Sequence, residues 1–404
     1  FMTEQVSALF SHYIIDGARQ DATPAELLAE CAGSPDGNIL RSGICPGEEY
    51  WDIIDETTEP PLTAFAYDSC DAAGYLDMLK AANPQSRRFP LPYPGQFTRL
   101  RIASALIDMI WREGHFRLGN LRIRTEWTWD TAPVGSMAAF YESVKEASSY
   151  MYDLGVRLSG YDFRQIAEGN FFKAEAWLPE KSQEAEDTED DSGQAFSADG
   201  FTEHEIPFRL PYESRHPWTG PGRKCGETIA PDMESILIYI PFDTCGYRLG
   251  GSMLSEALGQ AGGTSTNIQD PDYFIDCYEV VRELTEDGII MSGTTVSDGG
   301  LMTAADRMAK GQAGLSLDIS GLMSSYGESC LAKVLFGEVP GVLVQVSDTN
   351  YDYFDSQLLL QDVAYYPVGR PSSSCGQVTL GHAARPGVAD ILAALLGQAS
   401  EGED

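Results

Sequence analysis

The sequence has no long apolar segment, and its apolar runs, such as residues 236–240, have only the length of a strand. A membrane-spanning helix needs about 20 mostly apolar residues, so we predict no membrane span. The first ten residues contain neither a basic region nor a cleavage site, so no signal peptide is predicted.

Basic residues are scarce. The chain contains 27 Lys and Arg against 61 Asp and Glu, which gives a formal net charge of −34. Non-specific nucleic-acid binding depends on Lys and Arg that displace counterions from phosphates, and anionic membranes attract basic segments. We therefore predict no direct nucleic-acid or membrane partner. Two explanations of the acidity stay open: it keeps a large protein soluble, or it attracts a basic, histone-associated partner.

Motifs for metal binding and nucleophilic catalysis are missing. The eight cysteines contain no C-x2-C pair, so a zinc site is not predicted. Without a secretory signal, reduced thiols in the cytosol or nucleus are expected. The five histidines are dispersed, and neither H-E-x-x-H, G-x-S-x-G nor the phosphate-loop motif occurs.

The 404 residues are enough for two or three domain-sized cores. Residues 98–178 and 235–397 alternate between helical and strand periodicity, which predicts an α+β sandwich with a mixed sheet. Predicted strands cover residues 121–129, 156–158, 171–178, 235–240, 289–291, 315–319, 342–346 and 377–380. Predicted helices begin near Leu100, at Pro133, near Phe274, at Leu301 and at Pro386.

A break poor in apolar residues separates the two segments. It contains an acidic run that we predict to be disordered and consider a candidate partner-binding site. The acids of this run are Glu184, Glu186, Asp187, Glu189, Asp190 and Asp191. A solvated loop with no partner is the alternative.

Two glycine-rich turns each stand between a predicted strand and a predicted helix. They are Tyr247-Arg248-Leu249-Gly250-Gly251-Ser252 and Val296-Ser297-Asp298-Gly299-Gly300-Leu301. Glycines allow backbone amides to approach an anion at a helix N-terminus. Candidate phosphate-loop residues are therefore Arg248, Gly250, Gly251, Ser252, Asp298, Gly299 and Gly300. Ordinary turns are the alternative, with Asp298 predicted to cap the helix that follows it.

The order and spacing of these turns resemble the second synthetase-like half of formylglycinamide ribonucleotide amidotransferase (phosphoribosylformylglycinamidine synthase). That family has R-L-G-G-S/T, a long helix and H-D-x-S-D-G-G-L in this order, and Glu126-Trp127-Thr128-Trp129 resembles its N-W-M-W strand. The resemblance covers roughly residues 55–380. It implies an aminoimidazole ribonucleotide synthetase-like fold: an N-terminal subdomain (1–180), an acidic insertion (181–232), a C-terminal subdomain (233–385), and a terminal helix and tail (386–404).

Chemical positions of the family differ here. The family reaction uses ATP and magnesium, and magnesium prefers oxygen ligands. The family's P-L-A-D ends here in Ala64, and its A-x-x-E-A-L-x-N has Ser104 for Glu and Asp108 for Asn. Its G-G-K-D-S reads Ser159-Gly160-Tyr161-Asp162-Phe163, and its H-D reads Thr294-Thr295. We predict an inactive half with no catalytic residue, metal or cofactor.

The resemblance implies three alternative functions. Degenerate copies of this amidotransferase are gammaherpesvirus tegument proteins, which implies a pseudoenzyme of the virion tegument and host nucleus. Its partners would be host nuclear-body, chromatin or ubiquitin-pathway proteins and the remaining domains of the same polypeptide. Alternatively, the chain is the structural half of an active, cytoplasmic, ATP-dependent carbon–nitrogen ligase in purine biosynthesis. A module that retains nucleotide without turnover lies between them.

Overall fold

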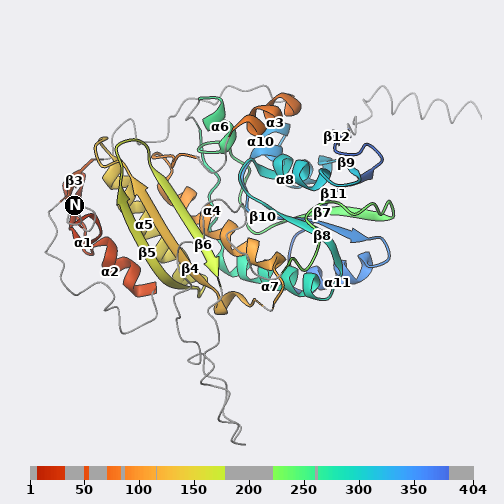
Figure 1. Ribbon diagram of the computed structural model, residues 1–404, viewed down its shortest axis with the longest axis horizontal. Coiled ribbons are helices and arrows are strands. Elements are labelled where there is room, and N and C mark those ends of the chain that lie inside the picture. The colour runs from red at the N-terminus through yellow and green to blue at the C-terminus, as the bar shows by residue number, and fades with distance from the viewer. Residues whose placement is uncertain are drawn as a thin grey trace, which may run out of the picture.

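Figure 1 shows a computed structural model of the chain, in which residues 7–31, 50–53, 71–82, 87–114, 116–177, 222–259 and 263–381 are described. Helices and strands alternate, and three sheets form, two of three strands and one of six. Parallel and antiparallel pairs occur in each sheet, so the predicted mixed α+β fold is confirmed.

One three-stranded sheet has the order β5-β4-β6, with β4 parallel to β5 and antiparallel to β6. Its strands are β4 (Arg122–Trp129), β5 (Arg157–Gln165) and β6 (Phe171–Trp177). Alternate β4 side chains, including Trp127 and Trp129, are fully buried on one face, as the sequence predicts. Helices α4 (Pro94–Ile107) and α5 (Ser136–Asp153) contribute to the same core.

The six-stranded sheet has the order β12-β9-β11-β7-β10-β8. Its strands are β7 (Ser235–Pro241), β8 (Ile290–Val296), β9 (Gly314–Leu317), β10 (Gly341–Ser347), β11 (Tyr366–Ser372) and β12 (Val378–Leu380). Figure 1 shows α7 (Pro271–Glu286) and α11 (Tyr351–Leu360) on one side of this sheet. On the other side lie α3 (Ala72–Ala81), α8 (Gly300–Ala309) and α10 (Leu331–Phe336).

Alternation along β7 distributes its side chains between two cores. Ile238 and Ile240 belong to a core that also contains α4, α5 and the three-stranded β5-β4-β6 sheet. Leu237 and Tyr239 belong to the core under α8 and α10. The first core therefore joins residues from both halves of the chain, and the rings of Tyr150 and Phe274 meet in it with centroids 6.3 Å apart.

The N-terminal region contains elements that the sequence patterns do not predict. These are α1 (Ser7–Phe10), α2 (Pro24–Cys31), β1 (Tyr13–Ile15), β2 (Ala18–Arg19) and β3 (Tyr50–Asp52). The Asp52 carboxylate accepts hydrogen bonds from the backbone amides of Gly135, Met137 and Ala138 at 2.8–2.9 Å. A distant residue thus caps the N-terminus of α5, which has no local side-chain cap.

Several helices and strands begin or end at residues other than those predicted. Helix α5 begins at Ser136 rather than Pro133, because Gly135 in left-handed backbone forms its N-cap. Strands β5 and β8 extend well beyond their predicted ends. The remaining short helices are α6 (Met253–Ala257), α9 (Ser320–Ser325), η3 (Asp108–Trp111) and η4 (Leu118–Asn120). The predicted helix from Pro386 and the acidic run 184–191 lie outside the described residues.

Two further findings concern the described part of the chain. None of its six cysteines forms a disulfide. None of its helices combines the length and apolar character that crossing a bilayer requires.

Candidate functional site

The two glycine-rich turns meet at one edge of the six-stranded sheet. Strands β7 and β8 are both antiparallel to β10, so they run in the same direction. Gly341, the first residue of β10, pairs with the last residues of both strands, Pro241 and Val296. The turns that follow β7 and β8 therefore lie together, and Glu338 reaches the same edge just before β10.

Several backbone amides in or next to these turns are already bound by protein acceptors. Gly250 N donates to Thr264 O at 3.0 Å, Ser252 N to Leu249 O at 3.0 Å, and Gly300 N to Ser297 O at 2.9 Å. Met253 N and Gly299 N both donate to Oε1 of Glu338 at 2.9 Å. Buried amides need such partners, and here the chain itself supplies them where the sequence predicts phosphate.

A buried ion-pair network joins the two turns. The side chain of Arg87 is 3% exposed, and its Nη2 donates to Glu338 at 2.8 Å and to the Gly251 carbonyl at 2.6 Å. Nη1 of Arg87 pairs with Asp298. Arg101 Nη1 binds the other Asp298 oxygen at 2.5 Å. Two guanidinium groups and two carboxylates thus pair between α4 and the sheet edge, and the more exposed Glu256 carboxylate lies 4.0 Å from Nε of Arg87.

The two carboxyl groups of this network respond differently to their surroundings. Burial acts to raise the pKa of Asp298, but Arg101 and Arg87 outweigh it, so the pKa is lowered. Burial is also the largest influence on Glu338, and Asp298 adds to it, so the pKa of Glu338 is raised although Arg87 opposes the rise. Asp298 is therefore the more strongly held anion.

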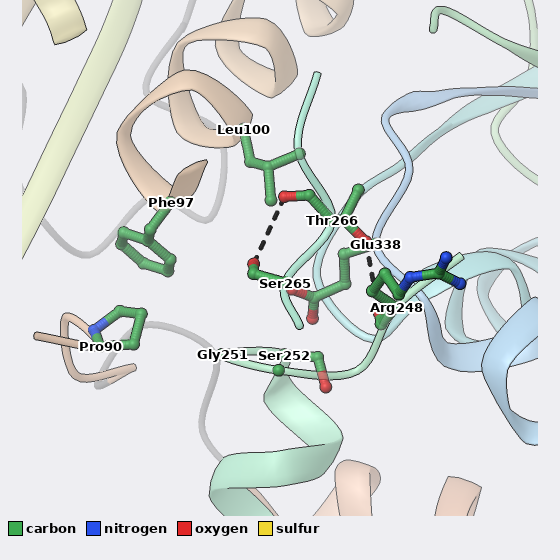
Figure 2. Close-up of a pocket in the computed structure, with 10 residues that line it drawn as sticks. Pro90, Phe97, Leu100, Arg248, Gly251, Ser252, Ser265, Thr266 and Glu338 are labelled. Atoms are coloured by element: carbon green, nitrogen blue, oxygen red, sulfur yellow. Dashed lines mark hydrogen bonds between the residues drawn. The ribbon is translucent and has the colours of Figure 1, made fainter. Parts of the chain in front are cut away.

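The space beside the turns is small. Figure 2 shows Pro90, Phe97 and Leu100 opposite Gly251 and the Ser252 side chain, around a hollow of about 230 Å³ that includes space open to solvent. An adjoining hollow of the same size is lined by Arg87, Arg101, Ser104 and Asp298, among others. The enclosed space in each hollow is about 10 Å³, which is room for about one water molecule. Arg248 lies at the rim, with its guanidinium directed away in Figure 2.

Asp298 does not cap the following helix, contrary to the prediction. The N-cap of α8 is Gly299, in left-handed backbone with φ of 74°, and no side chain caps it. The Asp298 carboxylate turns instead to Arg87 and Arg101 because it gains two cations there. Ser252 does cap its helix, and its hydroxyl accepts from the amide of Ser255.

Two of the altered chemical positions meet in the structure. The Thr295 hydroxyl donates to the Asp108 carboxylate at 2.5 Å and accepts from the Trp111 indole at 2.9 Å. Desolvation by the surrounding protein raises the pKa of Asp108, although the residue is exposed. The Thr295 hydrogen bond and nearby Arg307 lower this pKa and offset only part of the rise. Thr294 is buried beside Thr295 on β8.

The other altered positions are dispersed. Ser104 lines the second hollow, but its hydroxyl donates back to the Leu100 carbonyl at 2.8 Å within α4. Tyr161 and Asp162 lie in β5, where they pair with β4, and Figure 1 shows this strand on the opposite side of the molecule from β8. Ala64 lies outside the described residues.

These side chains do not fit a magnesium-bound nucleotide. The acid that remains in the Ser-Asp-Gly-Gly motif, Asp298, is held by two arginines, and Ser104 offers a hydroxyl that already donates elsewhere. In the ranges that the structure describes, no three His, Cys, Asp or Glu side chains gather in a way that would hold a metal ion. The sequence patterns did not single out Arg87, Arg101 or Glu338. An acid inside the apolar stretch 334–346 was the available signal for Glu338.

Curated proteins similar to this chain include phosphoribosylformylglycinamidine synthases. The chain is 25% identical over 287 residues to the probable phosphoribosylformylglycinamidine synthase, chloroplastic/mitochondrial, of Arabidopsis thaliana, covering 70% of this chain and 18% of that protein. It is 29% identical over 129 residues to the Homo sapiens phosphoribosylformylglycinamidine synthase, covering 30% of this chain and 9% of that protein. The chain is similar in sequence to part of phosphoribosylformylglycinamidine synthase.

No family model matches the chain. Among solved structures, PurL of Thermotoga maritima complexed with FGAR is 11% identical, with a TM-score of 0.45, and the match covers 72% of this chain and 40% of that one. The chain spans less than a fifth of the length of the curated synthases it matches. The sequence similarity supports the family that the turn motifs predict.

Proposed function

We propose that this chain is a catalytically inactive phosphoribosylformylglycinamidine synthase-like scaffold that acts by binding proteins. One observation carries the proposal: the acid that survives in the Ser-Asp-Gly-Gly motif, Asp298, is bound by Arg87 and Arg101. Magnesium prefers free oxygen ligands, and a carboxylate neutralised by two guanidinium groups is a poor one. Ser104, which stands where the family has Glu, supplies no carboxylate.

Thermal unfolding of the wild-type chain with ATP and magnesium tests the loss of the nucleotide site. A ligand at a hundred times its dissociation constant stabilises a protein by about 2.7 kcal/mol, which would raise the melting temperature by several degrees. We expect no rise beyond that produced by magnesium chloride with sodium sulfate at equal ionic strength. A saturable rise specific to ATP would refute the loss of the nucleotide site, and it would favour either half of an active ligase or a module that retains nucleotide without turnover.

The finer proposal concerns location and partners. We propose a viral tegument protein of the virion and host nucleus that binds basic or histone-associated nuclear proteins. The net charge of −34 and the acidic run at residues 184–191 support a basic partner. The resemblance to degenerate tegument homologues motivates the nuclear location, and a cytoplasmic location belongs to the alternative function.

A capture experiment distinguishes the contribution of the acidic run to partner binding from that of the net negative charge. Wild-type chain is compared in nuclear extract with a variant whose six acids in residues 184–191 are Ala. The matched control removes six charges from exposed described positions, Asp77, Asp153, Glu168, Asp272, Asp276 and Asp352. We expect histone-associated proteins to be lost from the first variant and retained by the second. Equal capture by all three chains would exclude the run, and no capture of nuclear proteins by the wild type would contradict the partner class.

A further inference from the structure

The carboxylate of Glu338 occupies a position where three donors converge. Its Oε1 accepts hydrogen bonds from the backbone amides of Met253 and Gly299, both at 2.9 Å. Its Oε2 accepts from Arg87 at 2.8 Å. Glu338 is 4% exposed, and it comes from the segment that enters β10 rather than from either turn.

Two amides from separate turns and a buried guanidinium form the donor set that a free oxyanion would need. We propose that Glu338 is a built-in anion that fills a site of the phosphate class, and that removing its side chain opens this site to a free oxyanion. The inference deepens the proposed inactive scaffold, because the chain itself occupies the anion position between its turns.

The partners that Glu338 leaves behind show why an anion belongs there. Its carboxylate is the buried partner of Arg87 Nη2, whereas Asp298 pairs with Nη1 and the Glu256 carboxylate, 43% exposed, lies 4.0 Å from Nε. Without the Glu338 side chain, Nη2 of Arg87 loses its carboxylate partner, and the amides of Met253 and Gly299 lose their acceptor. Both changes favour an anion of about the same size as a carboxylate.

The test titrates inorganic phosphate into Glu338→Ala and follows thermal unfolding and heat of binding, with sodium chloride at matched ionic strength. We expect a lower melting temperature than wild type, a saturable rise with phosphate, and binding at least ten-fold tighter than to wild type. Leu335→Ala, a buried apolar truncation in the neighbouring helix, controls for general salt effects. Glu338→Gln keeps the volume, so it should be destabilised without gaining phosphate binding.

If Glu338→Ala responds to phosphate no more than Leu335→Ala does, the proposal is wrong. Should Glu338→Ala not fold, amide NMR of Glu338→Gln decides. Loss of the carboxylate charge must shift the Met253 and Gly299 amide protons relative to wild type, and unchanged shifts would overturn the proposal. These outcomes are independent of the ATP test, because that test uses the wild-type chain, in which Glu338 is present.

Discussion

Replacing Arg87 by Met removes the guanidinium that joins Glu338 to Asp298 and keeps an unbranched apolar stem. That stem packs near Phe97, whose ring centroid lies 5.0 Å from the guanidinium carbon. In the variant, Asp298 keeps Arg101, whereas Glu338 keeps only the two amide donors and stays buried, with 5% of its side chain exposed. Removing one partner of a buried ion pair costs about 3–5 kcal/mol. Because both acids keep some of their hydrogen-bond partners, we expect a loss of about 3 kcal/mol in the free energy of unfolding, at the lower end of that range.

Urea unfolding at pH 7 measures this loss, and pH gives a second readout. Burial without its cation raises the folded pKa of Glu338 in the variant further above the unfolded value of about 4.3. A group whose pKa is higher in the folded than in the unfolded protein contributes its full stabilisation below its unfolded pKa. That stabilisation is lost as pH rises through its folded pKa. The difference between Arg87→Met and wild type should therefore shrink as pH falls from 7 toward 5.

Arg101→Met is the matched control. The Arg101 side chain is 23% exposed, and Asp298 keeps Arg87 when it is removed. A partly exposed pair contributes about 1 kcal/mol or less, so this variant should lose far less than Arg87→Met. If Arg87→Met lies within about 0.5 kcal/mol of wild type, the reasoning from a buried network fails. A loss that grows on acidification would refute the charge argument specifically.

Three further predictions follow from single contacts. Because Arg101 and Arg87 lower the pKa of Asp298 against burial, the wild type should lose stability as pH falls through that folded pKa. In Asp298→Asn, the midpoint of urea unfolding should fall less steeply with pH below pH 5 than in the wild type. An equally steep fall in both proteins would count against this prediction. Gly300→Ala should cost more than about 2 kcal/mol by urea unfolding, because φ is +67° and the added Cβ would lie 2.6 Å from Leu335 O. Asp52→Ala should lower the free energy of unfolding by about 1–2 kcal/mol because α5 loses its cap, and a thermal scan matching wild type would contradict that role.

Local patterns in the sequence predict local structure here. Alternation in residues 121–129 predicts β4, and its buried face carries Trp127 and Trp129. Helical periodicity predicts α7, and its buried residues include Phe274 and Val281. These predictions hold because the periodicity of a strand or helix is set by which face is buried, and that face is visible in a short window.

Strand β11 shows where such patterns fail. It contains Pro367 and Pro371, and a register shift interrupts its pairing with β7 near Gly369. Proline lacks the amide that a sheet ladder needs and normally argues against a central strand. The order of the sheet nevertheless places β11 between β9 and β7, so tertiary packing outweighed the local preference.

The candidate site is only partly predictable for a related reason. The turns are recognisable from their glycines, and the structure does bring them together. The side chains that bind one another between these turns are distant in the sequence: Arg87 is 211 residues from Asp298 and 251 residues from Glu338. No local pattern identifies a pair at that separation, so the prediction of an open phosphate loop could not include the side chains that fill it.

The core shared by both halves of the chain has a consequence for proteolysis. Residues on either side of 178–221 pack in it, among them Tyr150 and Phe274, and Arg99 donates to the Ile268 carbonyl at 3.0 Å. A protease that cleaves within 178–221 would break the polypeptide without removing these contacts. The two fragments should elute as one particle in gel filtration and separate only when denaturant exposes the surfaces that hold them together.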